Sequence, residues 1–269
     1  MAHPTLGTAL ITGASTGIGA LYAQRLAARG YDLILVARNA ARLHELAEQL
    51  QASAGRVVRA VSADLTDAAD VARIETLLRE DTSITMLVNN AGVGATGPLL
   101  ASDVEKMEQL ISLNVTALTR LTYSAAPGFA ARGLGTIINI SSMVAIAPEV
   151  LNGVYGASKA FVLALSLSLH HELHAKGVRV QAVLPGATAT DFWDLAGTPI
   201  AYLPKEIVMR ADAMVDAALI GLDRGELVTI PGLHDGAKYD AFEAARQAMH
   251  QEMSASVPAP RYQTSASAA

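Results

Sequence analysis

Thr12-Gly13-Ala14-Ser15-Thr16-Gly17-Ile18-Gly19 joins a short apolar run, 6–12, to a segment with the pattern of a helix that begins near Gly17. A bound pyrophosphate needs a tight turn, a backbone without Cβ at the point of closest approach, and amide groups at the positive end of a helix. Glycines at these three places meet those needs. The spacing Gly-x-x-x-Gly-x-Gly differs from the standard Gly-x-Gly-x-x-Gly fingerprint. The alternative is a flexible loop, but the strand before it and the helix after it favour a dinucleotide-binding turn.

Apolar runs of this kind alternate with helical patterns along most of the chain. Their hydrophobicity is continuous rather than alternating, which is typical of strands covered on both faces. The segments between them, such as 40–51 and 67–79, carry apolar residues at helical spacing. This repetition predicts an α/β fold, a Rossmann-type doubly wound parallel β-sheet with helices on both faces. The expected strands are Leu6–Thr12, Leu33–Ala37, Val57–Val61, Met86–Asn89, Thr136–Ile140 and Val178–Leu184, with Leu227–Ile230 as a candidate last strand.

The domain organisation follows from the absence of an internal linker. Residues 1–253 are expected to form a single dinucleotide-binding and catalytic domain. Residues 254–269 are dominated by Ala, Ser and Pro and have no periodicity, which predicts a disordered tail.

Composition excludes several function classes. Hydrophobic residues make up 51% of the 269 and charged residues 17%, and there is no cysteine, so disulfides and thiolate metal sites are impossible. The net charge of −5 argues against a nucleic-acid surface. The longest apolar run, 160–169, is too short to span a bilayer, and residues 1–10 lack a secretion signal. We therefore expect a cytoplasmic protein with no nucleic-acid or membrane partner.

Four further motifs follow the glycine-rich turn: Asn89-Asn90-Ala91-Gly92, Asn139-Ile140-Ser141-Ser142, Tyr155-Gly156-Ala157-Ser158-Lys159, and Pro185-Gly186. A tyrosine and a lysine four residues apart carry little information alone. All five motifs, in this order and spacing from about Thr8 to about Thr190, resemble the classical short-chain dehydrogenase/reductase family. The resemblance implies hydride transfer between a nicotinamide dinucleotide and a small-molecule carbonyl or alcohol, by a homo-oligomer that is a tetramer or dimer.

The reaction centre follows from spacing and resemblance together. Tyr155 and Lys159 share a helix face. Because a phenol titrates near ~10, a neighbouring ammonium is expected to lower its pKa and fit Tyr155 to donate the proton in reduction and accept it in oxidation. By resemblance, Ser142 rather than Ser141 bonds the substrate oxygen, since it lies thirteen residues before Tyr155. The family role of Asn114 is to interrupt a helix and hold a water that links Lys159 to solvent, although a mid-helix asparagine is also a common local kink.

The end of the second strand indicates which dinucleotide binds. A carboxylate there would hold the ribose 2′-hydroxyl of NAD, whereas an arginine can hold the 2′-phosphate of NADP. Arg38 follows this strand, with Arg42 as a second candidate, and Asp32 lies roughly 20 Å away at the other end. NADP(H) is therefore favoured over NAD(H). The alternative is an arginine that only meets solvent.

The resemblance supplies the other cofactor contacts. Asp64 and Leu65 match an adenine-contacting pair, although Asp64 can also cap the following turn or helix. The stretch 90–92 is expected at the adenosine ribose and phosphates, and 185–190 at the nicotinamide. The full set is Gly13, Ser15, Thr16, Gly17, Ile18, Gly19, Arg38, Asp64, Leu65, Asn90, Ala91, Gly92, Tyr155, Lys159, Pro185, Gly186, Thr188 and Thr190.

The sequence says less about the part of the site that binds the substrate. Residues 190–210 contain aromatic residues and the breakers Gly197, Pro199 and Pro204, and in the family this region is a mobile lid. An apolar pocket is expected from Val93, Met143, Phe192 and Trp193. The aromatic residues could equally be packing anchors of the lid. A lipophilic ketone, aldehyde or acyl-derived carbonyl is preferred, with ketoacyl thioesters, sugar alcohols and steroid-like substrates left open.

Two functions are compatible with these residues. The first is an NADP(H)-dependent carbonyl reductase or alcohol dehydrogenase. The second is a catalytically idle NADP(H)-binding regulator on the same fold, which the intact catalytic residues disfavour. A metal site is not expected, because His170, His171 and His174 lack the spacing of a known metal motif and a further ligand.

Overall fold

The structure, a computed structural model, describes residues 6–250 and 252–262. Its centre is a parallel sheet of seven strands in the order β3-β2-β1-β4-β5-β6-β9. The predicted doubly wound α/β fold is thereby confirmed, and the candidate last strand is present. The strands are β1 Thr8–Thr12, β2 Asp32–Ala37, β3 Val58–Ser62, β4 Ile84–Asn89, β5 Gly135–Ile140, β6 Val178–Val183 and β9 Val228–Thr229.

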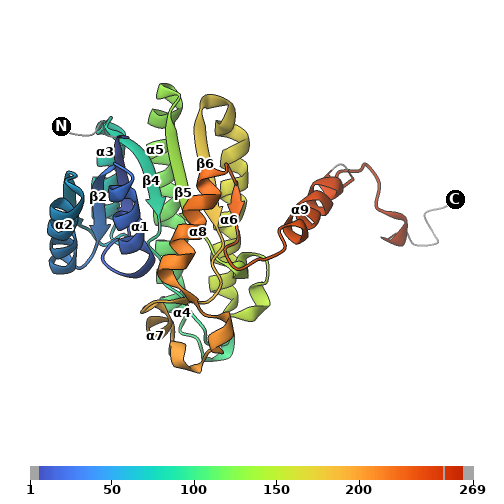
Figure 1. The fold of residues 1–269 in the computed structure, drawn as a ribbon. Coiled ribbons are helices and arrows are strands. Elements are labelled where there is room, and N and C mark those ends of the chain that lie inside the picture. The colour runs from blue at the N-terminus through green and yellow to red at the C-terminus, as the bar shows by residue number, and fades with distance from the viewer. Residues whose placement is uncertain (1–5, 251, 263–269) are drawn as a thin grey trace. The chain divides into compact units, whose positions relative to one another are not determined.

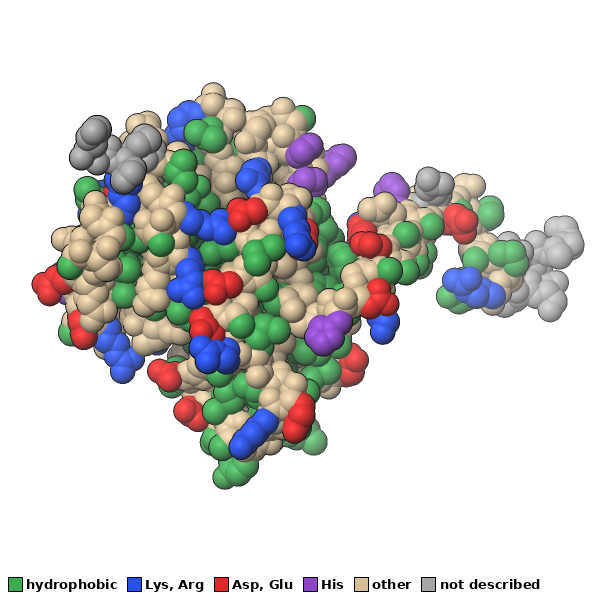
Figure 2. Space-filling view, viewed as in Figure 1, with side chains coloured by type: hydrophobic (Ala, Val, Ile, Leu, Met, Phe, Trp, Pro, Cys, Tyr) green, Lys and Arg blue, Asp and Glu red, His purple; other side chains and the backbone are tan. Residues whose placement is uncertain are grey.

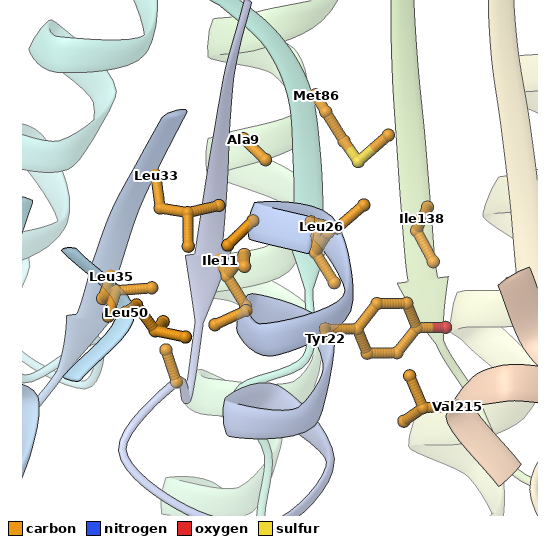
Figure 3. Packing of buried hydrophobic residues seen from close by; sticks show 14 of the residues in the cluster. Ala9, Ile11, Tyr22, Leu26, Leu33, Leu35, Leu50, Met86, Ile138 and Val215 are labelled. Carbon is orange, nitrogen blue, oxygen red and sulfur yellow. The ribbon is translucent and has the colours of Figure 1, made fainter. Parts of the chain in front are cut away.

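Helices cover both faces of this sheet (Figure 1). One face carries α1 Gly17–Ala28, α2 Ala40–Ala54 and α8 Ala211–Asp223. The other carries α3 Ala68–Glu80, α5 Leu118–Arg132 and α6 Gly153–Leu173. Five strands, β1, β2, β4, β5 and β6, are continuous apolar runs because each packs against both layers. Figure 3 shows the first layer, where Tyr22 and Leu26 of α1 and Val215 of α8 meet Ile11, Leu33, Met86 and Ile138 of the sheet.

A chain of buried amides and hydroxyls fixes the centre of the sheet. Asn89 at the end of β4 donates to the Thr122 hydroxyl and, over 2.9 Å, to the side-chain oxygen of Asn139 on β5. Asn139 in turn donates to Ser166 of α6 over 2.9 Å. Because each buried polar group needs a partner, this chain fixes β4, β5, α5 and α6 relative to one another. The helix that carries Tyr155 is therefore tied to the sheet.

The helical chain from Val104 to Arg132 is divided into three segments. Helix α4 covers Val104–Ile111, a π-helical segment follows at Ser112–Ala117, and α5 begins at Leu118. Asn114 lies within the π-helical segment. Such segments alter the direction in which a side chain projects and are frequent at functional sites.

The chain between β6 and α8 forms a small second layer over the carboxyl ends of the strands. It contains β7 Thr188–Ala189 paired with β8 Met209–Arg210, and the short helix α7 Phe192–Ala196. The described 3₁₀ turns are Leu99–Ala101, Met143–Ala145, Pro148–Val150, His174–Lys176, Ile200–Tyr202, Lys205–Ile207 and Pro260–Tyr262.

The chain divides into two compact units, Met1–Gly232 and Leu233–Ala269. The second contains α9 Ala237–His250, none of whose residues is buried. The single domain over 1–253 stays a prediction, as does the disordered tail over 254–269, of which 263–269 lie outside the described residues. No helix among the described residues is long and apolar enough to cross a membrane.

Acidic and basic side chains lie next to one another on the face formed by α1 and α8 (Figure 2). Arg25 of α1 pairs with Asp216 of α8 over 2.6 Å, and Arg29 pairs with Asp223 over 2.8 Å. These exposed pairs contribute at most about 1 kcal/mol each. In each pair the carboxylate neutralises the charge of its arginine.

Candidate active site

The glycine-rich turn lies at the carboxyl end of β1, where strand order reverses between β1 and β4. Ligands of doubly wound sheets bind at this kind of crevice. Gly13 and Gly17 have φ of +65° and +54°, in the left-handed region that favours glycine. At Gly19 a Cβ would overlap the Gly13 carbonyl oxygen and lie 2.6 Å from the Asn90 amide nitrogen. All three glycines are thus required by geometry.

The amino end of α1 lacks a side chain that competes for its amides. Thr16 is its N-cap residue and makes no side-chain cap hydrogen bond. The first turn of a helix leaves amide groups that a phosphate can accept from, and the helix dipole favours an anion there. Thr190 approaches the same turn, with its methyl carbon 3.3 Å from where a Cβ of Gly17 would lie. Ser15, Thr16, Gly17, Ile18 and Thr190 thus surround a position suited to a pyrophosphate.

Asn90 supports this turn from beneath. Its side-chain amide donates to the Thr12 and Gly13 carbonyl oxygens over 2.9 and 3.1 Å. The Thr12 hydroxyl accepts from the backbone amides of Asn90 and Ala91, both over 3.0 Å. The side-chain nitrogen of Asn90 is therefore bonded to the turn, and the expected contact of Asn90 with the adenosine ribose stays a prediction.

The adenine end contains Arg38, Asp64 and Leu65. Arg38 follows β2 and is exposed, close enough to Asp64 to affect its titration. Hydrogen bonds from Thr66, with help from the Arg38 charge, hold the pKa of Asp64 below its ordinary value. Leu65 is 6% exposed, and its side chain packs in the core. Asp64 also accepts from the Thr66 backbone amide over 2.9 Å, as the capping alternative predicted.

Tyr155, Lys159 and Ser142 meet at the carboxyl end of β5. Burial raises the pKa of Tyr155 to about 12, and a hydrogen bond with Ser142 acts in the opposite direction. Burial lowers the pKa of Lys159 to about 8. The Lys159 ammonium donates to the Ile140 carbonyl over 2.9 Å and lies 5.9 Å from the centre of the Tyr155 ring.

The direction for Tyr155 corrects the sequence-based expectation of a lowered pKa. Spacing alone indicated an ammonium beside a phenol, but it did not reveal that both groups are almost wholly buried. Burial disfavours the charged form of each, which raises the pKa of the phenol and lowers that of the amine. Both groups are therefore held towards their neutral forms.

Asn114 links this centre to the chain that follows β4. Its amide nitrogen donates to the Val93 carbonyl over 2.9 Å and to the Ser158 hydroxyl over 3.2 Å. Its oxygen accepts from the Val93 amide over 3.0 Å. A Cβ at Gly92 would lie 3.1 Å from this oxygen and 3.5 Å from the Lys159 nitrogen, so both groups border Gly92. The water-holding role of Asn114 stays a prediction.

The segment after β6 contains the residues that are expected at the nicotinamide. The Pro185 carbonyl accepts from the backbone amide of Met143 over 2.9 Å, which places 185 beside Ser142. The Thr188 hydroxyl donates to the Gly186 carbonyl over 3.1 Å, and the Thr188 carbonyl accepts from the Trp193 indole over 3.0 Å. Thr188 is thus bonded within its own segment.

The expected pocket residues come from three segments. Val93 and Phe192 pack in one apolar cluster with Tyr155. Met143 is partly exposed, with its sulfur 4.0 Å from where a Cβ of Gly186 would lie. Trp193 is 8% exposed and meets Phe192 edge to face at 5.7 Å between ring centres. Phe192 thus lies beside Tyr155, whereas Trp193 is bonded to the segment that precedes α7.

Three residues of the site were missed by sequence reasoning. Asn152 caps α6 by accepting from the backbone amide of Val154 over 2.9 Å, and an asparagine before a helical pattern is a signal that could have found it. Gly94 and Thr96 contact α7, at Phe192 and Ala196 respectively. Nothing in the local sequence indicates these two contacts.

Histidines do not form a metal centre within the described residues. No group of three or more His, Cys, Asp or Glu side chains there is arranged to hold an ion. The rings of His170 and His174 lie 4.9 Å apart. Partial burial and the neighbouring histidines lower the pKa of His170.

Known proteins resemble the whole of this arrangement. A short-chain dehydrogenase from Sphingobium yanoikuyae, in complex with NADPH, is 51% identical, with a TM-score of 0.93 over 96% of this chain and 100% of that one. A bulky-bulky ketone specific alcohol dehydrogenase from Comamonas testosteroni is 46% identical, with a TM-score of 0.89 over 97% of this chain and 100% of that one.

A curated relative is more distant. The very-long-chain 3-oxoacyl-CoA reductase of Anas platyrhynchos is 36% identical over 193 residues, which are 70% of this chain, and the match spans 62% of that relative's length. The family model for short chain dehydrogenase matches residues 7–198, which contain the glycine-rich turn, Ser142, Tyr155 and Lys159. The chain belongs to the short-chain dehydrogenase family.

Proposed function

We propose that this protein is an NADP(H)-dependent oxidoreductase that reduces lipophilic ketones and oxidises the corresponding alcohols. The observation that carries the proposal is the meeting of Ser142, Tyr155 and Lys159 beside Gly92, with Asn114 bonded to the same segment. These are the groups that a carbonyl needs when hydride arrives at carbon and charge develops at oxygen.

The proposed roles follow from the chemistry of each group. Bound at the glycine-rich turn, NADPH would supply the hydride. Ser142 donates a hydrogen bond to the substrate oxygen, and Tyr155 delivers the proton to it. Burial holds Tyr155 protonated in the resting protein, which suits an acid. Lys159 stabilises the phenolate that remains after proton transfer. Asn114 holds the Val93 segment and Ser158 in place around Lys159.

The residues present fit a dinucleotide. The turn has glycines where a side chain could not be accommodated, and the amino end of α1 has no side-chain cap. We assign the 2′-phosphate to Arg38, because it is exposed at the end of β2 and no carboxylate follows that strand. The NADPH complex of the Sphingobium yanoikuyae relative supports NADP(H) over NAD(H).

The substrate class rests on the pocket. The cluster beside Tyr155 contains Val93, Val144, Leu151, Val154 and Phe192, all apolar. Such a lining favours a ketone with hydrocarbon substituents over a sugar or a charged acid. The specificity of the Comamonas testosteroni relative for bulky-bulky ketones supports this choice.

We also propose a homo-oligomer, either a tetramer or a dimer. Ile111 of α4, Tyr123 of α5 and Phe161 of α6 are 44%, 66% and 40% exposed. Symmetric packing of these helices would cover them. Light scattering that reports a monomer of 28.0 kDa at micromolar concentration would contradict this proposal. The cytoplasmic location stays a prediction.

Absorbance of NADPH with a panel of ketones and aldehydes tests the function. Consumption that depends on an apolar ketone, and that is slower with NADH, is the expected result. Tight NADPH binding with no consumption across the panel would instead favour the idle regulator.

A further inference from the structure

The ring of Phe192, the first residue of α7, lies between two parts of the site that are distant in sequence. Its centre is 5.8 Å from that of the Tyr155 ring. On another side it meets Gly94, where a Cβ would overlap the ring carbon Cζ and lie 2.7 Å from Cε2. The ring therefore fills the space that a side chain at position 94 would occupy. We call Gly94 together with the Tyr155 ring the Phe192 socket.

The glycine at 94 has no conformational reason to be glycine. It is absent from the described glycines with positive φ, so an alanine could adopt its backbone angles. The three atoms nearest to a Cβ at this position all belong to the Phe192 ring. Gly94 and Phe192 consequently form a matched pair, in which a small residue on one segment makes room for a large one on the other.

Hydrogen bonds hold α7 in the position that seats the ring. The Thr96 amide and hydroxyl both donate to the Ala196 carbonyl, over 3.2 and 2.9 Å. The hydroxyls of Thr96 and Thr198 are 2.9 Å apart. Trp193 fixes the other side of α7 through its indole bond to Thr188. The segment 93–98 thus both holds α7 in position and lies beside Tyr155.

We propose that Phe192 and Gly94 together set the size of the substituent that the site accepts beside the carbonyl. The inference rests on the proposed function. The carbonyl must approach the Tyr155 hydroxyl, so one substituent must fit beside the Phe192 ring or displace it from its socket. Displacement gives up the ring's contacts with Gly94 and Tyr155, so each added carbon is accepted less well. Loss of the ring removes this restriction.

Four variants test the proposal against phenyl ketones whose second substituent grows from methyl to isopropyl to cyclohexyl. Phe192→Ala empties the socket. Gly94→Ala keeps the Phe192 ring but adds a methyl group in the space that the ring occupies. In the double variant Gly94→Ala/Phe192→Ala the same methyl group is added, but there is no ring for it to displace. Leu195→Ala is the control, because Leu195 lies on the same helix but is 81% exposed. Each value is divided by that of the wild type, so differences in ketone reactivity cancel.

The measured quantity is kcat/KM for the cyclohexyl ketone relative to the methyl ketone. Phe192→Ala should raise this ratio roughly 10- to 100-fold, because a few carbons in an apolar pocket discriminate by about that much. Gly94→Ala alone should also change the ratio, whereas in the Phe192→Ala background it should have little further effect. Leu195→Ala should leave the ratio unchanged. A ratio that stays constant in Phe192→Ala, or equal effects of Gly94→Ala in both backgrounds, would overturn the proposal.

A binding measurement separates this inference from the proposed function. Quenching of Trp193, the only tryptophan in the chain, reports ketone affinity in the presence of NADP⁺ without turnover. If the wild type reduces none of the ketones, the proposed function is wrong, and the affinity ratio across the same variants decides the inference. Affinities that change in Phe192→Ala by the same factor for methyl and cyclohexyl ketones would reject it.

Discussion

The two halves of the active site are built from different kinds of interaction. The half expected to bind the dinucleotide relies on backbone: positive φ at Gly13 and Gly17, no room for a Cβ at Gly19, and uncapped amides at α1. The substrate half relies on side chains that meet across long sequence separations, such as Phe192 against Gly94 and Tyr155.

This difference determines which half of the site can vary. A backbone turn with three constrained glycines accepts few substitutions and binds one chemical feature, the pyrophosphate. A pocket wall made by one ring on a short helix can change with a single substitution. One scaffold can thereby retain its cofactor while its substrate changes, which agrees with the general rule that folds host many activities.

The largest effect is expected for a variant that abolishes proton transfer and leaves the dinucleotide half of the site intact. Tyr155→Phe removes the proton donor but keeps the ring against Phe192. Positioned acid–base catalysis contributes ~10²–10⁴-fold, so kcat for ketone reduction should fall by that order while the Kd for NADPH changes little. The control is Tyr123→Phe, which alters an exposed tyrosine of α5. Near-wild-type turnover under conditions where chemistry limits the rate would remove Tyr155 from the mechanism.

The second prediction concerns the buried charge between the two halves. The pKa of Lys159 is 10.5 ordinarily and about 8 in the folded protein. Between these values the unfolded chain holds more protons, so the free energy of unfolding rises with pH. Above pH 10.5 Lys159 is neutral in both states and this gain in stability is complete. Below pH 8 the buried ammonium lowers the free energy of unfolding by on the order of 3 kcal/mol. The pH window of this stabilisation is therefore 8 to 10.5.

Denaturant unfolding of Tyr155→Phe and Tyr155→Phe/Lys159→Met tests this across that window. The common background removes the titration of Tyr155, whose raised pKa would lower stability as pH rises above 10. The stability of the single variant should rise relative to the double variant between pH 8 and 10.5. The lost bond to Ile140 adds an offset that does not depend on pH. Parallel curves would show that Lys159 titrates normally, and Lys176→Met, at an exposed position, is the control.

The third prediction concerns the dinucleotide half of the site, at Arg38. An arginine–phosphate contact is charge-assisted, and its loss costs on the order of 1.5–3 kcal/mol. Arg38→Ala should therefore weaken NADPH binding roughly 10- to 150-fold and leave NADH binding nearly unchanged. Arg224→Ala, at an exposed arginine after α8, is the matched control. If NADH and NADPH lose affinity equally, Arg38 does not bind the 2′-phosphate.

The same division explains what the sequence could predict. Strands β2, β5 and β6 start or end within one residue of their predicted bounds, because continuous apolar runs between glycines and polar residues are a local signal. The roles of Gly13 and Gly17 were also local, since a tight turn between a strand and a helix requires them. Both features belong to the sheet and to the dinucleotide half.

The substrate half has no such signal. Thr96 and Ala196 are a hundred residues apart, and neither position looks unusual among its neighbours. In the sequence Gly94 looks like an ordinary loop glycine, because the group that excludes a side chain there, the Phe192 ring, is almost a hundred residues away along the chain. The direction of the Tyr155 pKa was missed for a related reason, since burial depends on every segment that packs around the site.

The smallest expected effect tests how the lid is held on its seat. Thr96→Val keeps the shape of the side chain and the backbone bond to Ala196 but removes two hydroxyl bonds of 2.9 Å, to Ala196 and to Thr198. Hydrogen bonds of this kind contribute about 1 kcal/mol each, so opening of the lid should become roughly 5- to 30-fold more frequent. Hydrogen exchange of the amides at 193–198 measures this opening.

Thr85→Val is the control, because it loses a bond of the same 2.9 Å to the Leu6 carbonyl at the opposite end of β4. Exchange at 193–198 should accelerate in the first variant and not in the second. NADP⁺ with a ketone should reduce the difference by ordering the lid from its other side, through Thr188 and Thr190, which precede α7. If both variants exchange like the wild type, Thr96 does not hold the lid, and the packing of Phe192 in its socket alone keeps it closed.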